Sequence, residues 1–293
     1  MSDTSVSACK DLVRVIERDR RDALGEGPLW SPRNQALFWV DILGRRINRM
    51  ALADGRVDSF DQPHYAAWII EREAGGFVAG IGRDIVRIDL EADEREPIVS
   101  VDPRNAGNRL NDAKADARGR IWAGTMPVTC DRPSGAFYRL DPDGALAQVD
   151  GPYTIANGPA IDPDGAFLLH TDTARGTIFR FDVRDDGSLG EAAPFIVFDE
   201  QWGNPDGMTF DAEGGLWVAC WGASRVMRFA PDGAPDRHID LPASQITSCT
   251  FAGPDLDRLF VTSASDGVTE EHGGALFEVD PGCRGLPTLK YKG

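Results

Sequence analysis

The chain has 293 residues, 42% of them hydrophobic, and a formal net charge of −16. This composition is too apolar for a disordered protein, and the length is sufficient for a large buried core. The negative charge argues against nucleic acid or an anionic membrane surface as a partner, because each favours a basic face. No stretch approaches the roughly 18 apolar residues of a membrane span.

The N-terminal residues and the cysteines indicate a cytoplasmic protein. Residues 1–20 are polar and lack the apolar segment of a signal peptide. The five cysteines are odd in number, widely spaced and without a C-x-x-C pair, which favours reduced thiols over disulfides or a zinc knuckle. They are Cys9, Cys130, Cys220, Cys249 and Cys283. We expect a monomer or a small homo-oligomer in the cytoplasm.

Short strand-like segments recur along the chain. The first, residues 12–17, alternates around Val13 and Val15 and belongs to no repeat. Apolar runs then follow at 37–40, 77–79, 121–123, 167–169, 216–219 and 259–261. Taken at equivalent residues, these runs are 40 to 49 residues apart. Alternating segments that predict a second strand follow five of them, at 46–50, 136–140, 177–181, 226–229 and 275–279.

Tight-turn motifs separate the predicted strands. Asp-Pro-Asp-Gly occurs at 141–144 and 162–165, and related turns occur at 116–119, 211–214 and 230–233. Alternation alone would also fit a sandwich or a barrel, but the regular spacing favours six units of about four strands. This pattern predicts an all-β fold, a six-bladed β-propeller with a central axial channel. We expect a single domain over residues 1–293, with residues 12–17 completing the last blade and closing the ring.

The repeats also predict a functional site. Counting back 11 or 12 residues from the apolar run of four repeats leads to Glu26, Asn111, Asn157 and Asp206. Equivalent positions of a propeller are related by rotation about its axis, so these oxygen-bearing side chains should converge. Asn and Asp could instead be simple turn formers, but Glu is a poor turn residue. Glycines after Glu26, Asn157 and Asp206 would let the backbone turn sharply.

Two carboxylates and two amides at one spot predict a divalent cation. Unpaired carboxylates would repel each other in a partly dry channel. Ligation by oxygen alone suits a hard ion such as Ca²⁺, Mg²⁺ or Mn²⁺, with Zn²⁺ and Fe²⁺ as alternatives. An acidic protein does not repel a small neutral substrate.

Several motifs resemble the SMP-30/gluconolactonase/LRE family, which includes regucalcin and bacterial sugar lactonases. They are Leu24-Gly-Glu-Gly-Pro-Leu-Trp30, Arg109-Leu-Asn-Asp-Ala-Lys114, Ala123-Gly-Thr-Met126, Ala156-Asn-Gly-Pro159, Pro205-Asp-Gly-Met208 and Leu216-Trp-Val-Ala-Cys220. The resemblance extends from about Leu24 to Asp280. Each motif is weak by itself, but their combination and order are specific.

The resemblance implies a metal-dependent carboxylic ester hydrolase that opens sugar aldonolactones to aldonic acids. It places the ligands of one divalent ion on Glu26, Asn157 and Asp206, and substrate contacts on Arg109 and Asn111. The ion would polarise the lactone carbonyl and activate a water molecule, and Asp206 is the candidate general base. Without the resemblance, Arg109 would be read as an ordinary surface arginine in an ion pair.

Some features leave the assignment open. Some family members carry an acidic sugar-binding residue soon after Ala-Gly-Thr-Met, whereas this chain has Pro-Val-Thr-Cys-Asp at 127–131. A phosphotriesterase-like metal-dependent propeller, and a non-catalytic calcium-binding or scaffold propeller, are the alternatives. The absence of a Gly-x-Ser-x-Gly motif disfavours a serine esterase.

Other side chains receive mainly structural interpretations. Asp112 and Lys114 are expected to form a structural pair outside the chemistry, and His170 to be a hydrogen-bonded core histidine rather than a residue of the channel. Core packing is the simplest interpretation of most tryptophans, whereas Tyr65, Trp68 and Trp202 are candidates for the wall of a pocket.

Overall fold

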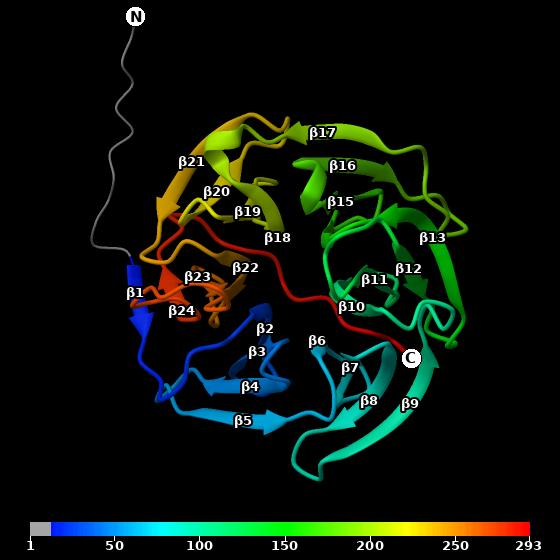
Figure 1. Cartoon of the computed structure of the whole chain (residues 1–293), viewed down its shortest axis with the longest axis horizontal. Helices are drawn as coiled ribbons and strands as arrows, with labels where there is room; N and C mark the ends of the chain where they lie inside the picture. Colours follow the sequence, from blue (N-terminus) through cyan, green and yellow to red (C-terminus); the bar gives the residue numbers. More distant parts are fainter. Residues whose placement is uncertain (1–12) are drawn as a thin grey trace, which may run out of the picture.

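A computed structural model describes residues 13–293 as six four-stranded antiparallel sheets arranged in a ring (Figure 1). The predicted six-bladed β-propeller is therefore confirmed. Cys9, and the first residue of the predicted strand at 12–17, lie outside the described residues. The described cysteines Cys130, Cys220, Cys249 and Cys283 are free thiols. Among residues 13–293, no helix is long and apolar enough to cross a membrane.

Each sheet is a blade whose strands follow one another outward from the ring axis (Figure 1). The innermost strands are β2 (Gly25–Ser31), β6 (Ala66–Glu71), β10 (Asn108–Ala115), β14 (Ala156–Ile161), β18 (Asn204–Phe210) and β22 (Ile246–Ala252). The second strands are β3 (Ala36–Asp41), β7 (Phe77–Ile81), β11 (Ile121–Pro127), β15 (Phe167–Asp172), β19 (Leu216–Trp221) and β23 (Arg258–Ser263). The third strands are β4 (Arg46–Ala51), β8 (Asp84–Asp89), β12 (Gly135–Leu140), β16 (Thr177–Asp182), β20 (Arg225–Phe229) and β24 (Leu276–Val279). The outer strands are β5 (Val57–Asp61), β9 (Glu94–Ser100), β13 (Leu146–Tyr153), β17 (Ala193–Val197), β21 (Pro235–Asp240) and β1 (Val13–Ile16).

The apolar runs that revealed the repeat all fall in the second strands. Phe38, Trp122 and Trp217 are buried there between neighbouring blades. These runs are continuously apolar because both faces of a second strand are covered by neighbouring blades. The outer strands are partly exposed and keep charged side chains in water. Two short 3₁₀ helices, η1 (Thr173–Arg175) and η2 (Glu200–Trp202), occupy loops on the ring.

The N-terminal strand closes the ring as predicted. β1 pairs antiparallel with β24, with Val13 opposite Val279 and Ile16 opposite Leu276. The last blade thus combines the start of the chain with three strands from its end (Figure 1). This pairing gives β24 a partner on its outer edge.

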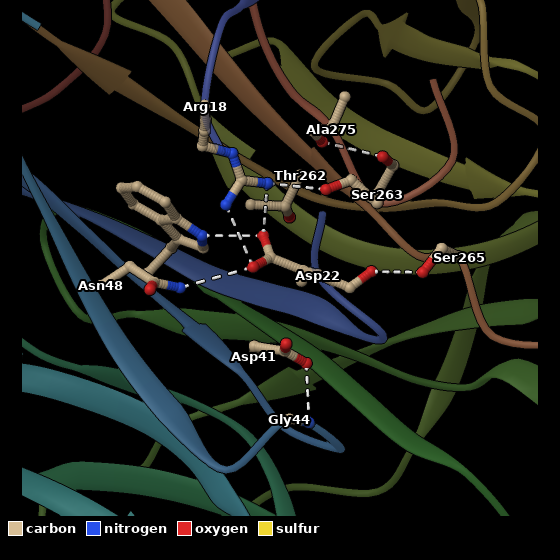
Figure 2. Close-up of polar contacts among 12 residues, drawn as sticks. Arg18, Asp22, Asp41, Gly44, Asn48, Thr262, Ser263, Ser265 and Ala275 are labelled. Carbon is tan, nitrogen blue, oxygen red and sulfur yellow. Dashed lines mark hydrogen bonds and ion pairs between the residues drawn. The ribbon is translucent and has the colours of Figure 1, made fainter. Parts of the chain in front are cut away.

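Hydrogen bonds of the buried Asp22 connect the first blade with the last (Figure 2). Its carboxylate accepts hydrogen bonds from Arg18 (2.8 and 3.1 Å) and from the Trp39 indole (2.9 Å). Its backbone carbonyl accepts one from the Ser265 hydroxyl (2.8 Å), and its backbone N–H donates to Gly274 (2.9 Å). Burial raises the pKa of Asp22, and Arg18 opposes part of that rise. Asp22 therefore links the first blade to the last.

Two of the predicted turns have a second function. The carboxylate of Asp116 accepts hydrogen bonds from the Trp122 indole (2.8 Å) and from Arg120 (2.6 Å). The carboxylate of Asp211 likewise accepts a hydrogen bond from the Trp217 indole, at 3.0 Å. In both blades the tryptophan follows the aspartate by six residues, a spacing that does not by itself indicate a contact. These aspartates satisfy buried indole donors besides forming turns.

The C-terminal segment, residues 283–293, crosses the centre of the ring (red in Figure 1). It forms isolated β-bridges from Gly285 to Asp211 and from Tyr291 to Arg72, which belong to different blades. Residues of all six innermost strands and residues 286–289 of this segment line a cavity of about 220 Å³. The tail therefore packs across one end of the space enclosed by the inner strands.

His170 is buried as predicted, but it is not hydrogen-bonded as predicted. It is fully buried in β15, and neither ring nitrogen has a hydrogen-bond partner among the described residues. Its ring packs on Phe137 (centroids 3.9 Å apart) and against the edge of Tyr153 (4.8 Å). Burial lowers the pKa of His170 from 6.5 to about 3.

We expect His170 to make the fold acid-sensitive. Between about pH 6.5 and 3 the unfolded chain binds a proton that the folded chain does not, so acidification favours unfolding. One such group lowers the free energy of unfolding by about 1.4 kcal/mol per pH unit in this range. Urea unfolding between pH 5 and 8 should show a shallower pH dependence for His170→Leu than for the wild type. Parallel curves for the two proteins would refute this interpretation.

Candidate metal centre and active site

Each innermost strand changes register with its neighbour near its own start. The shifts fall directly after Glu26, Ala66, Leu110, Asn157, Pro205 and Ile246. A β-bulge of this kind bends the strand and redirects its side chains. The four oxygen-bearing residues predicted from the repeat all lie at or next to these bulges. The bulges therefore explain how one position in the repeat can present side chains toward the ring axis.

Two of the three predicted glycines turn the chain at this level. Gly27 and Gly158 have φ of +50° and +72°, in the left-handed region that disfavours other residues. Gly207 is different, and here the turn prediction is wrong. Its φ is not positive, but a Cβ atom at this position would lie 2.1 Å from the Ser248 hydroxyl. Gly207 is required for close packing of β18 against β22.

Glu26 and Asp206 form a buried pair of carboxyl groups. Each residue is 5% exposed. Glu26 accepts one hydrogen bond, from the N–H of Gly27 (3.0 Å), and Oδ1 of Asp206 is buried without a hydrogen-bond partner in the described part of the chain. Burial and the charges of Asp206 and Asp112 raise the pKa of Glu26 well above its usual value. Burial and the charge of Asp112 do the same for Asp206. The ionised pair lacks a full counter-charge.

A chain of hydrogen bonds joins the other three predicted residues. Nη1 of Arg109 donates to Oδ1 of Asn111 (2.6 Å) and to the carbonyl of Leu110 (3.0 Å). Nδ2 of Asn111 donates to Oδ1 of Asn157 (2.7 Å) and to the carbonyl of Ala156 (2.7 Å). All three side chains are buried, so the alternative of an exposed Arg109 is wrong. Arg109 also contributes favourable electrostatics to Glu26 and Asp206, which places all five residues in one region.

The donor set fits a hard divalent cation. Among residues 13–293, no three His, Cys, Asp or Glu side chains are arranged to hold a metal ion. A cation held at this site would take Oδ1 of Asn157 together with the carboxylates of Glu26 and Asp206. The Asn157 oxygen has a second lone pair besides the one that meets Asn111. Oδ1 of Asp206, which has no hydrogen-bond partner among residues 13–293, could be a ligand, and oxygen ligands suit Ca²⁺, Mg²⁺ or Mn²⁺.

Asp112 is a third buried carboxylate, for which the sequence predicts only a structural pair with Lys114. It is 3% exposed, and burial raises its pKa to about 6. Its Oδ1 accepts the N–H of Ala113 (2.7 Å), and its Oδ2 is buried without a hydrogen-bond partner among the described residues, although the nearby N–H of Gly158 favours the ionised form. No ion pair joins it to Lys114 within 4 Å in the part of the chain described, although Lys114 acts on it electrostatically. Asp112 thus lies close to the backbone beside Asn157 and adds negative charge to the site.

In the segment 127–131, the side chain near Arg109 is a cysteine and not the acidic residue of the family pattern. Asp131 is exposed and is hydrogen-bonded within its own loop, to Thr129 (2.5 Å) and Arg132 (3.3 Å). Cys130 is the residue of this segment that lies near Arg109. Burial raises the pKa of the Cys130 thiol, and the Arg109 guanidinium opposes part of that rise.

The three aromatic residues proposed for a pocket wall have different environments. Trp68 is 1% exposed and lines the cavity among the inner strands. Trp202 packs on Phe198 and Phe229. Tyr65 packs partly buried against the core between the first two blades, with the guanidinium of Arg45 over its ring.

Comparison with known proteins agrees with this architecture. Residues 24–265 match the family model described as "SMP-30/Gluconolactonase/LRE-like region". The chain is 33% identical to the pentonolactonase XacC of Haloferax volcanii, over 95% of this chain and 97% of that protein. It is 33% identical to a 6-deoxy-6-sulfogluconolactonase of Pseudomonas putida, over 89% and 93% of the two chains.

A solved structure with the same fold is that of regucalcin from Agrobacterium tumefaciens, described as a calcium-binding protein. Its TM-score is 0.90 at 27% identity, and the alignment covers 95% of this chain and 97% of that one. The family match and the extent of these alignments lead to one conclusion. The chain belongs to the SMP-30/gluconolactonase/LRE-like family.

Proposed function

We propose that this protein is a metal-dependent sugar lactonase that hydrolyses aldonolactones to aldonic acids. The observation that carries the proposal is the buried Glu26–Asp206 pair, with a free carboxylate oxygen, beside Arg109 and Asn111. Family relatives that are named lactonases support the choice of a cyclic sugar ester as substrate.

In this proposal, Glu26, Asn157 and Asp206 hold one divalent ion. When bound, the ion supplies a Lewis acid and lowers the pKa of coordinated water. Ca²⁺, Mg²⁺ and Mn²⁺ fit the oxygen donors best, and Zn²⁺ and Fe²⁺ are included in the test. The cytoplasmic location and the small oligomeric state also stay predictions.

The side chains of the site have separate roles in the reaction. Asp206 accepts a proton from the attacking water at the carboxylate oxygen that does not hold the ion, as a new bond forms between the water oxygen and the carbonyl carbon. The ring C–O bond breaks, and the proton is returned to the departing ring oxygen. Arg109 and Asn111 orient the sugar hydroxyls by hydrogen bonds. Asn111 is itself held by Arg109, so the two act as one unit.

The decisive experiment is a pH-stat assay of pentono- and hexono-lactones, with spontaneous opening subtracted. We expect turnover that is lost after chelation and restored by one or more of the five ions. Full turnover in the stripped protein would exclude the proposed role of the metal. Hydrolysis of aryl phosphotriesters without lactone turnover would favour a phosphotriesterase. Ion binding without turnover of either substrate would favour a non-catalytic propeller.

We expect Arg109→Met to raise KM for the lactone about 10- to 100-fold with a smaller change in kcat. This range corresponds to the loss of one or two hydrogen bonds from a charged donor. Methionine retains much of the buried apolar stem, and Arg109→Lys, which keeps the charge but not the planar fork, should be intermediate. Initial-rate kinetics measure both constants. An unchanged KM in the methionine variant would remove Arg109 from the substrate site.

A further inference from the structure

A hydroxyl group lies between the strands that carry Asn157 and Asp206. It belongs to Thr173, the first residue of η1, which follows β15 directly. Thr173 is 7% exposed, and its backbone N–H donates to the carbonyl of Ile155 (3.0 Å). Asp172 caps η1 and also accepts the N–H groups of Thr154 and Ile155, each at 2.9 Å. The hydroxyl is thus held rigidly beside the start of β14.

The hydrogen bonds of this hydroxyl determine the orientation of the Asn157 amide. Oγ1 of Thr173 donates its single proton to the carbonyl of Pro205 (2.8 Å), the residue before Asp206. Its oxygen can therefore only accept from Asn157, whose Nδ2 lies 2.9 Å away. The opposite orientation would set the Asn157 carbonyl oxygen against an acceptor. Oδ1 of Asn157 is consequently turned away from Thr173, toward Asn111.

We propose that Thr173 is a positioning residue of the metal centre. It presents Oδ1 rather than the amide nitrogen of Asn157 to the cation, and it links the backbone of β18 to this amide. The inference rests on the proposed function, because it takes Asn157 and Asp206 as ligands. Partners that orient metal-ligating side chains typically change affinity 10- to 100-fold when removed.

The test measures binding of Mn²⁺ alone to the chelator-stripped full-length protein, with free Mn²⁺ counted by electron paramagnetic resonance. Thr173→Val removes the hydroxyl but keeps the backbone contacts and the branched shape. We expect its Kd to be about 10- to 100-fold weaker than that of the wild type. Thr173→Ser retains the hydroxyl and should bind within about threefold of the wild type. Lactone turnover by Thr173→Val should largely recover at saturating Mn²⁺.

The matched control is Thr171→Val, which removes a buried hydroxyl from β15, two residues before Thr173. Thr171 lies opposite Asn157 in the register of β14 and β15, but its hydroxyl donates to the carbonyl of Thr177 (2.7 Å) in β16 and not to a candidate ligand. Its loss should lower stability without changing the Kd for Mn²⁺. Wild-type affinity in Thr173→Val, or an equal loss in both valine variants, would overturn the proposal. If Thr173→Val fails to fold, Thr173→Ala carries the same expectation.

The same substitution made in the Asn157→Asp protein tests the orientation of the amide separately. In Asn157→Asp both side-chain oxygens are equivalent, so the side chain has no wrong orientation. The affinity lost on adding Thr173→Val should then be smaller than in the wild-type background. An equal loss in both backgrounds would contradict the orienting role. Tight Mn²⁺ binding without lactone turnover would refute the lactonase proposal and leave the role of Thr173 intact.

Discussion

Asp206→Asn should lower kcat for lactone hydrolysis at least about a thousandfold and raise the melting temperature of the metal-free protein. A general base contributes about 10²- to 10⁴-fold, and the substitution also removes a charged donor to the ion. The gain in stability has a different origin. Burial and the neighbouring carboxylate of Asp112 disfavour the ionised form of Asp206 in the ion-free fold. A neutral amide of the same shape avoids that cost.

Glu71→Gln is a matched control for this pair of effects. Glu71 is also fully buried, but its carboxylate accepts the Ser31 hydroxyl (3.1 Å) and lies near Lys290 (3.3 Å) and Arg33 (3.4 Å). Its neutralisation should lower the melting temperature and leave kcat unchanged. Thermal unfolding in chelator and pH-stat kinetics at saturating Mn²⁺ measure both properties. Wild-type turnover in Asp206→Asn would refute the role of this residue.

Binding of the ion should stabilise the protein much more at pH 8 than at pH 5. In the ion-free fold, the raised pKa values of Glu26 and Asp206 mean that the site takes up protons more readily than the unfolded chain. The stability gained from this uptake is present at low pH and is lost as the pH rises through the folded pKa values. A cation competes with these protons, so its contribution increases with pH.

Scanning fluorimetry from pH 5 to 8, with and without Mn²⁺, measures the difference. At a free ion concentration about a thousandfold above Kd the gain is about 4 kcal/mol, which corresponds to a shift of roughly 10 °C for a chain of this size. Taking the difference between the two curves removes the contribution of His170. Asp206→Asn should lose most of the effect. A shift of equal size at pH 5 and pH 8 would contradict the assignment of both carboxyl groups to the ion site.

The surroundings of Asp112 could not be predicted from the sequence. The motif Arg-Leu-Asn-Asp directed attention to Arg109 and Asn111, but it gave no reason to separate Asp112 from Lys114. In the folded chain, Asp112 lies near the N–H of Gly158 in the next blade and beside Glu26 and Asp206, whereas Lys114 forms no ion pair with it within the described residues. The contact depends on the bulges in β10 and β14, which a regular strand pattern does not reveal.

The repeat pattern was sufficient to predict the six blades, the closing strand at residues 12–17 and the level at which the candidate ligands lie. These features repeat at a fixed spacing, because each blade buries the same strands against its neighbours and needs the same turns. Which side chains meet across blades depends instead on the folded ring. Thr173 contacts Asn157 and Pro205, and residues 286–289 cover the cavity between the inner strands. Such contacts arise when the ring closes and brings distant segments together, so no local periodicity encodes them.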